Sequence, residues 1–300
     1  MTDRVAVVTG AGRGIGRAIA LELAASGWAV VVNDLGSGPE GSGSDSAPGQ
    51  EVVDEIRASG GEAVLNDADV SNWDAAHSLV ATATREFGRI DGIVNSAGIL
   101  RDTIFHRLTE RDWDAVIAVH LKGSFNVSRA AAPVFREQGS GAYVHMTSTA
   151  GLIGNLAQAN YASAKLGIVG LSRSIALDLA RFGVRSNAIA PFAWSRLIGT
   201  LPENTEAERA RVAKFRSMTP EQVAPLAAYL LSDQAKDVTG QIFVVRRNEI
   251  MLMSQPRPIR TLHRSDGWNQ ENLADQLVPA LRSSFVPLER SPDVFSWDPV

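Results

Sequence analysis

The chain has 300 residues, of which 45% are hydrophobic and 21% charged, and its formal net charge is −4. The acidic balance argues against a protein that binds nucleic acid or a membrane surface through a basic face, and the absence of cysteine excludes disulfides, a thiolate nucleophile and a cysteine-ligated zinc site. No apolar run reaches the roughly 20 residues of a membrane span. Only four residues precede the first apolar run at Val5, which leaves no room for a signal peptide. We therefore expect a soluble, cytoplasmic protein without a metal site.

Apolar segments and amphipathic segments alternate along the chain, a pattern typical of strands followed by helices. In chain order, the sequence predicts strands at 5–8, 29–32, 63–65, 93–94, 142–146, 184–190 and 241–245. Between them, it predicts helices at 14–26, 51–59, 73–87, 113–137 with an interruption near Gly123, 159–182 and 221–231. Such alternation builds a parallel sheet with helices on both faces. We therefore predict an α/β, doubly wound fold for a domain over residues 1–245.

Three segments depart from this pattern. Residues 36–49, GSGPEGSGSDSAPG, consist mainly of Gly, Ser and Pro and predict a mobile loop inserted after the second strand. Residues 195–217 are polar and helix-prone, and we predict a substrate lid over 194–218. The tail, 246–300, is predicted as a C-terminal extension. Within it, residues 270–284 carry a leucine at every fourth position, which predicts one amphipathic helix.

A glycine-rich turn, TGAGRGIG, stands between the first strand and the first helix. Glycine permits positive φ and lets backbone N–H groups approach a pyrophosphate, while the N-terminus of the following helix favours an anion. Glycine turns also arise for structural reasons alone, but this position between strand and helix favours a dinucleotide site. The predicted cofactor residues are Gly10, Gly12, Arg13, Gly14, Ile15 and Gly16.

Asp34 ends the second strand, 18 residues after Gly16. An acid at about this spacing accepts hydrogen bonds from the ribose hydroxyls of a dinucleotide. A carboxylate would repel the 2′-phosphate of NADP, so the sequence favours NAD; NADP is disfavoured rather than excluded, because Arg13 could reach that phosphate. The alternative for Asp34 is a solvated loop acid. Residues at the ends of later strands complete the predicted site, and these are Asp69, Val70, Asn95, Ala97 and Gly98.

Tyr161 and Lys165 are four residues apart at the start of a predicted helix, so both side chains lie on one face. A neighbouring ammonium would lower the pKa of the phenol from its usual value of about 10. Tyr161 could then exchange a proton with an alcohol or carbonyl oxygen, and Lys165 could also donate to the nicotinamide ribose. Ser148 ends the fifth strand and could hold the substrate oxygen. The alternative for the pair is a surface tyrosine packed along a lysine stem.

Taken together, these segments resemble the short-chain dehydrogenase/reductase family over roughly residues 3–245. TGAGRGIG, NDLG, DADV, NSAG, MTSTAG and YASAK occur in order and at family-like intervals. The resemblance implies a seven-stranded parallel Rossmann sheet, a nicotinamide cofactor and hydride transfer with Tyr161 as acid and base. It also implies a homodimer or homotetramer built on the long helices near 112–136 and 159–181.

Three positions depart from the family's pattern. His120 stands where the family usually has an asparagine that holds a water leading to the lysine. A histidine can hydrogen-bond water and relay protons, so His120 is a candidate catalytic residue, or else a helix-packing residue. Pro191-Phe192 replaces the usual Pro-Gly after the sixth strand, and Pro191 keeps the family's place beside the cofactor. Arg246-Arg247-Asn248 stands where Asp-Gly-Gly is usual.

Within the family, VVNDLG with its insertion, GILRD, VHLKGSF, GNLAQANYASAKLG and NAIAPFAWSR resemble the (3R)-hydroxyacyl-CoA dehydrogenase unit of peroxisomal multifunctional β-oxidation enzymes. This resemblance implies NAD-dependent oxidation of a (3R)-3-hydroxyacyl-CoA to the 3-oxoacyl-CoA. Arginines in the tail could bind the phosphates of CoA, or form a solvated or subunit-facing stretch. They are Arg246, Arg247, Arg257, Arg260 and Arg264, with Glu249 as the single acid among them.

Two other classes of function stay open. The same site could serve a hydroxysteroid dehydrogenase or a 3-oxoacyl-carrier-protein reductase. A lipid-like substrate is suggested by apolar residues near the lid, which could equally belong to the core; these are Phe192, Trp194, Leu197 and Ile198. A non-catalytic dinucleotide-binding protein could keep the same fold, because a fold does not establish function. The presence of Ser148, Tyr161 and Lys165 argues against that class.

Overall fold

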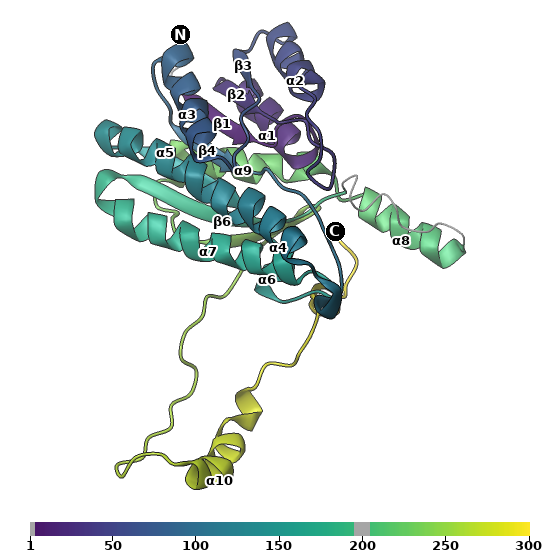
Figure 1. Ribbon diagram of the computed structural model, residues 1–300, viewed down its shortest axis with the longest axis vertical. Helices are drawn as coiled ribbons and strands as arrows, with labels where there is room; N and C mark the ends of the chain where they lie inside the picture. Colours follow the sequence, from purple (N-terminus) through teal and green to yellow (C-terminus); the bar gives the residue numbers. More distant parts are fainter. Residues whose placement is uncertain (1–3, 195–204) are drawn as a thin grey trace.

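The computed structural model describes residues 4–194 and 205–300, apart from the side chains of 207 and 211. Its centre is one sheet with the strand order β3-β2-β1-β4-β5-β6-β7-β8 (Figure 1). The strands are β1 (Val5–Thr9), β2 (Ala29–Asn33), β3 (Ala63–Asn66), β4 (Gly92–Asn95), β5 (Gly141–Met146), β6 (Val184–Phe192), β7 (Ile242–Arg246) and β8 (Glu249–Leu252). The first seven are parallel and match the seven predicted strands. The order reverses between β1 and β4, where ligands bind in sheets of this kind.

β8 is a strand that the sequence analysis missed. It pairs antiparallel with β7, with Arg246 opposite Glu249, and Arg247 in the connecting turn has a φ of 58°. The sheet therefore has eight strands, and its last strand lies in the segment predicted as an extension. Residues of β8 alternate between half-buried and exposed, so this strand lacks the continuous apolar run that marks the buried strands.

Helices cover both faces of the sheet, as predicted from the alternation of elements. They are α1 (Gly14–Ala25), α2 (Ala47–Ala58), α3 (Trp73–Phe87), α4 (Glu110–Ile117), α5 (Gly123–Gln138), α6 (Thr149–Leu152), α7 (Ala159–Leu179), α8 (Glu206–Arg216), α9 (Ala224–Leu231), α10 (Gln270–Leu281) and α11 (Ser291–Val294). None of the helices among the described residues is long and apolar enough to cross a membrane.

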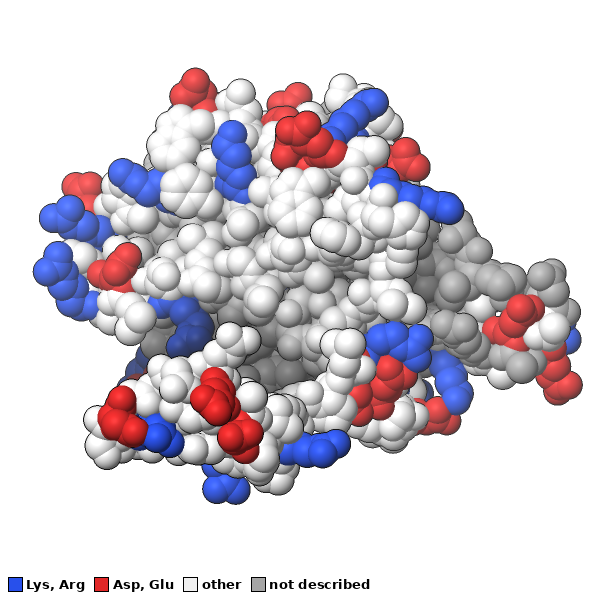
Figure 2. All heavy atoms as spheres, turned by 60° about the horizontal axis from the view of Figure 1, so that its bottom comes forward, with Lys and Arg blue, Asp and Glu red and all other residues white. Residues whose placement is uncertain are grey.

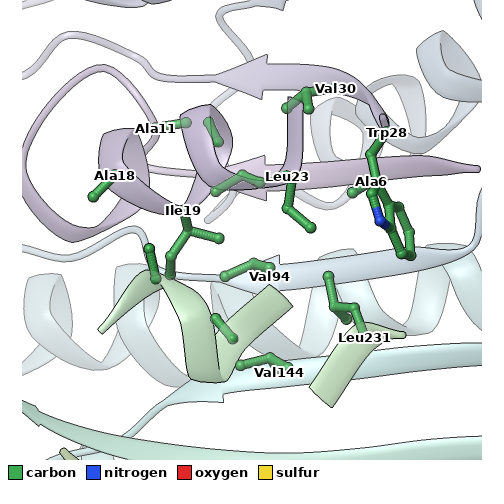
Figure 3. Packing of buried hydrophobic residues seen from close by; sticks show 14 of the residues in the cluster. Ala6, Ala11, Ala18, Ile19, Leu23, Trp28, Val30, Val94, Val144 and Leu231 are labelled. Carbon is green, nitrogen blue, oxygen red and sulfur yellow. The ribbon is translucent and has the colours of Figure 1, made fainter. Parts of the chain in front are cut away.

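The core has two halves, one on each face of the sheet. On one face, Ile19 and Leu23 of α1 and Leu231 of α9 pack against the strands (Figure 3). Successive side chains of a strand point to opposite faces. In β1, Ala6 and Val8 therefore join this half while Val5 and Val7 join the other. Burial on both faces explains why β1 reads as an unbroken apolar run.

The long helix predicted over 113–137 is interrupted. A five-residue π-helical segment, Ala118–Lys122, separates α4 from α5. The predicted interruption near Gly123 is therefore confirmed, since α5 begins at that residue. Isolated π-helical turns are frequent at functional sites, and this one carries His120.

The C-terminal extension leaves the body of the protein after β8 and returns to it. In Figure 1 the chain runs outward, forms α10 and comes back toward the C-terminus. No residue from 254 to 290 is buried, and burial resumes at Ser291. The helix predicted over 270–284 is confirmed as α10 followed by a 3-10 turn, Arg282–Ser284. We call the segment 254–290 the arm.

Surface charges of both signs are interspersed on the face that Figure 2 shows, rather than gathered by sign. The predicted lid falls partly on residues 195–204, which lie outside the described residues. The described part of the lid contains α8, whose first turn is held by a capping box between Thr205 and Glu208.

Candidate functional site

The glycine turn after β1 is shaped so that side chains would not fit. Gly10 and Gly14 have φ values of 64° and 53°, which favour glycine. A Cβ on Gly16 would lie 2.2 Å from the carbonyl oxygen of Gly10, and a Cβ on Gly12 would lie 2.8 Å from Oδ2 of Asp34. These close approaches leave the backbone bare at the start of α1, where N–H groups can receive a phosphate.

A cavity of about 600 Å³ opens at this turn, at the switch point between β1 and β4. Its volume is within the range of about 300–1,000 Å³ of small-molecule and cofactor sites. Most of the predicted cofactor residues line it, and these are Gly10, Gly12, Arg13, Gly14, Ile15, Gly16, Asp34, Asp69, Val70, Ala97 and Gly98. The bare turn and the volume of the cavity together fit a dinucleotide.

Asp34 is held in place at one side of the cavity. The backbone N–H of Gly12 donates to Oδ2 at 2.7 Å, and the N–H of Gly36 donates to Oδ1 at 2.7 Å. The carboxylate is therefore a fixed negative group in the cavity wall, not a freely solvated loop acid.

The Gly/Ser-rich loop after β2 also lines the cavity, which the sequence analysis did not predict. Ser37, Gly38, Pro39 and Gly41 face the cavity. The carbonyl of Pro39 accepts from the N–H of Leu100 at 3.1 Å, which ties the loop to the segment after β4. Composition identified a loop, but only the tertiary contacts reveal that it lines the cavity.

Ser148 and Tyr161 come together at the carboxyl end of β5. Ser148 is the N-cap of α6, and its hydroxyl accepts from the N–H of Ala150 at 3.1 Å. A hydrogen bond joins the Ser148 side chain to the phenol of Tyr161. Buried Asn160 fixes the start of α7, because its Oδ1 accepts from the N–H of Tyr161 at 2.8 Å and its Nδ2 donates to the carbonyl of Arg101 at 3.1 Å. Sequence reasoning missed Asn160.

Lys165 lies beneath Tyr161, but their electrostatics differ from the prediction. Its Nζ donates to the carbonyl of Met146 at 2.7 Å and lies 5.5 Å from the centre of the Tyr161 ring. Burial raises the pKa of Tyr161 to about 12 and lowers the pKa of Lys165 to about 7. The predicted lowering of the phenol pKa is therefore wrong for this structure. Burial disfavours both charged forms, so the lysine is a weak source of positive charge at neutral pH.

His120 touches the same group of residues. Its Nε2 lies 2.8 Å from the carbonyl oxygen of Ile99, and its ring meets the Tyr161 ring edge-on at 5.3 Å between centroids. A Cβ on Gly98 would lie 2.3 Å from Cε1 of His120. Burial, together with the charge of Lys165, lowers the pKa of His120 to about 3, so the ring is neutral. Its Nδ1 is buried without a hydrogen-bond partner among the described residues, which leaves one polar atom for a water or ligand.

Four of the predicted cofactor residues do not line the cavity. Asn95 is buried and its Nδ2 donates to Oγ of Ser128 at 2.9 Å, which is a structural contact. Pro191 lies within β6, opposite Val245 of β7. Tyr161 and Lys165, in the first two turns of α7, also lie outside the cavity lining.

The five arginines of the tail do not form one cluster. Arg246 is buried and lies 3.5 Å from Glu249 in an ion pair. Arg247 donates to the carbonyl of Pro299 at 3.2 Å. The other three lie on the exposed arm, where Arg264 pairs with Asp266. The suggested phosphate site made by all five is therefore absent from the single described chain.

Lys165→Met is expected to flatten the pH dependence of stability. The pKa of Lys165 is lowered in the folded protein, so the unfolded chain binds more protons between about pH 7 and pH 10. The unfolding free energy of the wild type should therefore rise with pH across that window, by up to about 1.4 kcal/mol per pH unit more than that of the variant. Urea unfolding at several pH values checks this. The exposed Lys236→Met is the control, and equal slopes for wild type and Lys165→Met would contradict the expectation.

Comparisons with known proteins agree with this geometry. A family model described as enoyl-(acyl carrier protein) reductase matches residues 10–246. A short-chain type dehydrogenase/reductase of Mycobacterium tuberculosis is 48% identical over 245 residues, which cover 81% of this chain and 82% of the relative. The peroxisomal hydratase-dehydrogenase-epimerase of Neurospora crassa is 42% identical over 264 residues, or 88% of this chain. The chain matches only 28% of that fungal enzyme's length.

A solved structure supports the same relation. The crystal structure of a short chain dehydrogenase from Mycobacterium avium aligns with a TM-score of 0.82 and 40% sequence identity. The alignment covers 95% of this chain and 96% of that one. The likeness therefore extends through most of the C-terminal extension as well as the sheet.

Proposed function

The chain belongs to the short-chain dehydrogenase/reductase family, and we propose that it transfers a hydride between NAD(H) and a (3R)-3-hydroxyacyl-CoA/3-oxoacyl-CoA pair. Membership makes the protein an NAD(P)-dependent oxidoreductase that acts on CH–OH groups and small-molecule substrates. The observation that carries the proposal is the meeting of Ser148, Tyr161 and Lys165 next to a dinucleotide-sized cavity. The choice of acyl-CoA rests on the likeness to the fungal dehydrogenase-containing enzyme.

Each side chain has a role that follows from its contacts. Tyr161 exchanges the hydroxyl proton of the substrate, and Ser148 holds the reacting oxygen beside the phenol. Lys165 and His120 form the buried polar floor beneath that phenol. A nicotinamide ring, when bound, accepts or supplies the hydride. Because burial raises the pKa of Tyr161, the phenol holds its proton at neutral pH and donates it to the carbonyl oxygen in the reducing direction. Oxidation of the alcohol needs the phenolate as base, so it is expected to speed up as the pH rises.

A reductase acting on a carrier-protein substrate is the second candidate. The description of the matching family model names an acyl carrier protein, and a 3-oxoacyl-[acyl-carrier-protein] reductase of Synechocystis is 41% identical over 254 residues, which favours this candidate. Asp34 argues for NAD(H), because its fixed carboxylate would repel the 2′-phosphate of NADP(H).

Absorbance of the reduced nicotinamide separates these candidates. The screen should cross NAD(H) and NADP(H) with (3R)- and (3S)-3-hydroxyacyl-CoA, 3-oxoacyl-carrier protein, steroid alcohols and simple secondary alcohols. The proposal expects the highest kcat/KM for NAD with the (3R)-hydroxyacyl-CoA. Turnover confined to NADPH and the carrier-protein substrate would favour the second candidate, and no turnover of any pair would favour a non-catalytic protein.

We infer that the arm packs on a second copy of this chain, which gives the expected homo-oligomer. The arm has 37 residues and none of them is buried. Burial of apolar surface within this chain therefore does not offset the conformational entropy that the arm loses when it becomes ordered. At roughly 100 Å² each, its exposed apolar side chains offer about 700 Å², close to the ~800 Å² that each partner buries in a standard interface. They are Ile259, Trp268, Leu277, Val278, Phe285, Val286 and Leu288.

Two further features favour a second copy as the occupant. A two-fold dimer uses the same surface on both partners, so two arms exchange reciprocally and both are covered. Arg257 and Arg260 hydrogen-bond only to a carbonyl and a hydroxyl among the described residues. Their charge complements a second copy of a chain whose net charge is −4.

A single introduced thiol can test whether the arm packs on a second copy, because the chain has no cysteine of its own that would react with the label. Leu277→Cys, labelled with a photoreactive maleimide, is expected to yield covalent dimers on illumination. Val278→Asp should reduce the mass measured by light scattering, whereas Ser283→Asp, which adds the same charge to the same arm, should not. A monomeric wild type, or crosslinks only within one chain, would exclude this packing.

A further inference from the structure

The last ten residues, Ser291–Val300, dock onto the body of the protein beside the candidate catalytic residues. We call them the C-terminal segment. The N–H of Ser291 donates to the carbonyl of Gly154 at 2.9 Å, and its hydroxyl donates to the same oxygen at 3.2 Å. Gly154 follows α6, the short helix that Ser148 caps. The segment is thus attached to the loop that leads from Ser148 to Tyr161.

Phe295 anchors the segment in an apolar cluster. It is only 7% exposed, and its ring meets Phe192 edge-on at 5.1 Å between centroids. The same cluster includes Leu152 and Ile153, at the end of α6. The packing of Phe295 therefore supports the helix that the Ser148 hydroxyl caps, by accepting from the N–H of Ala150.

The turn between β7 and β8 binds the end of the segment. Arg246 donates to the carbonyl of Trp297 and its guanidinium lies 5.2 Å from the Trp297 ring. Trp297 Nε1 donates to Oε1 of Glu249 at 2.7 Å. The N–H of Asn248 donates to the carbonyl of Val300 at 2.9 Å. The turn and the strand ends beside it therefore hold residues 297–300 against the sheet.

Two of the three departures from the family's sequence pattern thereby receive one explanation. Phe192 follows Pro191 where a glycine is usual, and it supplies the ring that Phe295 meets. The residues 246–248 replace the usual Asp-Gly-Gly, and they bind Trp297, Pro299 and Val300. A glycine at 192 or 247 would remove the side chain that makes the contact, whereas Asn248 contributes its backbone N–H.

The segment also reaches the lid. Lys214 of α8 forms an ion pair with Asp298. The pair is exposed and contributes little to stability by itself. Because Asp298 follows the anchored Trp297, the pair connects α8 to the same structure that supports α6.

We propose that the C-terminal segment is a fixed wall of the substrate side of the site, with Phe295 as a positioning residue for Ser148. This proposal extends the proposed function, because the effect of the C-terminal segment on turnover depends on that function. Loss of Phe295 loosens α6, so the Ser148 hydroxyl no longer lies steadily against the phenol. The cavity that holds the dinucleotide contacts none of these residues, so cofactor affinity is unchanged.

Hydrogen exchange and kinetics test the wall independently. Phe295→Ala is expected to speed amide exchange over 149–154 and to lower kcat on the order of tenfold to a hundredfold, with the Kd for NADH unchanged. Phe105→Ala, an exposed phenylalanine in the 3-10 turn Phe105–Arg107, should change neither. Asp298→Asn is a milder variant that should speed exchange only over 206–216.

The exchange measurement needs no substrate, so it tests whether the C-terminal segment supports α6 even if the proposed substrate is wrong. Unchanged exchange over 149–154 in Phe295→Ala would overturn the proposal. So would a parallel loss of NADH affinity, because that would indicate general destabilisation. Failure of the wild type on every acyl-CoA would contradict the proposed function and leave the exchange result standing.

Discussion

Tyr161→Phe is expected to lower kcat by about 10²- to 10⁴-fold, the usual range for loss of a general acid or base, while NADH binding is retained. The substitution removes one oxygen and with it the hydrogen bond to Ser148. The ring keeps its edge-on contact with His120, 5.3 Å between centroids, so the packing of the site survives. Stopped-flow or steady-state absorbance with the best substrate of the screen measures the loss.

The chain has three tyrosines, which supplies a matched control. Tyr229 is 43% exposed on α9, and its hydroxyl lies 3.5 Å from the carbonyl of Gln234. Tyr229→Phe should leave kcat unchanged. If Tyr161→Phe and Tyr229→Phe have the same activity as the wild type, Tyr161 does not carry the proton and the assignment of the site fails.

Replacement of Asp34 is expected to change the preference between the two nicotinamide cofactors. Hydrogen bonds to a charged group contribute about 1.5–3 kcal/mol, so Asp34→Asn should weaken NAD binding by about tenfold to a hundredfold. The double variant Asp34→Ser with Leu35→Arg should in addition accept NADP, because it removes a repulsive carboxylate and adds a guanidinium at a residue that lines the cavity.

The ratio of kcat/KM for NAD to that for NADP measures this preference. Glu51 also lines the cavity, and Glu51→Gln removes a negative charge of the same size. If the two single variants shift the ratio equally, the preference comes from the net charge of the cavity and not from Asp34. A wild type that prefers NADP would refute the NAD assignment directly.

The strands and the helices that cover the sheet could be predicted from the sequence because their signals are local. A buried parallel strand appears in the sequence as an unbroken apolar run, as in β1. A helix is recognised by apolar residues that recur every three to four positions. β8 and α6 were missed, since β8 is half-exposed and α6 has only four residues. Within the site, the glycine turn and Asp34 line one cavity as expected, whereas Asn95 is buried in structural contacts.

The sequence by itself determined the order of elements, the bare glycine turn and the one-turn spacing of Tyr161 and Lys165, because each depends on residues close together in the chain. Only the tertiary structure decided the pKa of the phenol, since that depends on burial, which here raises it. The tertiary structure alone also joined Ser291 to Gly154, 137 positions apart. Contacts at such separation come from packing and leave no periodic trace in the sequence.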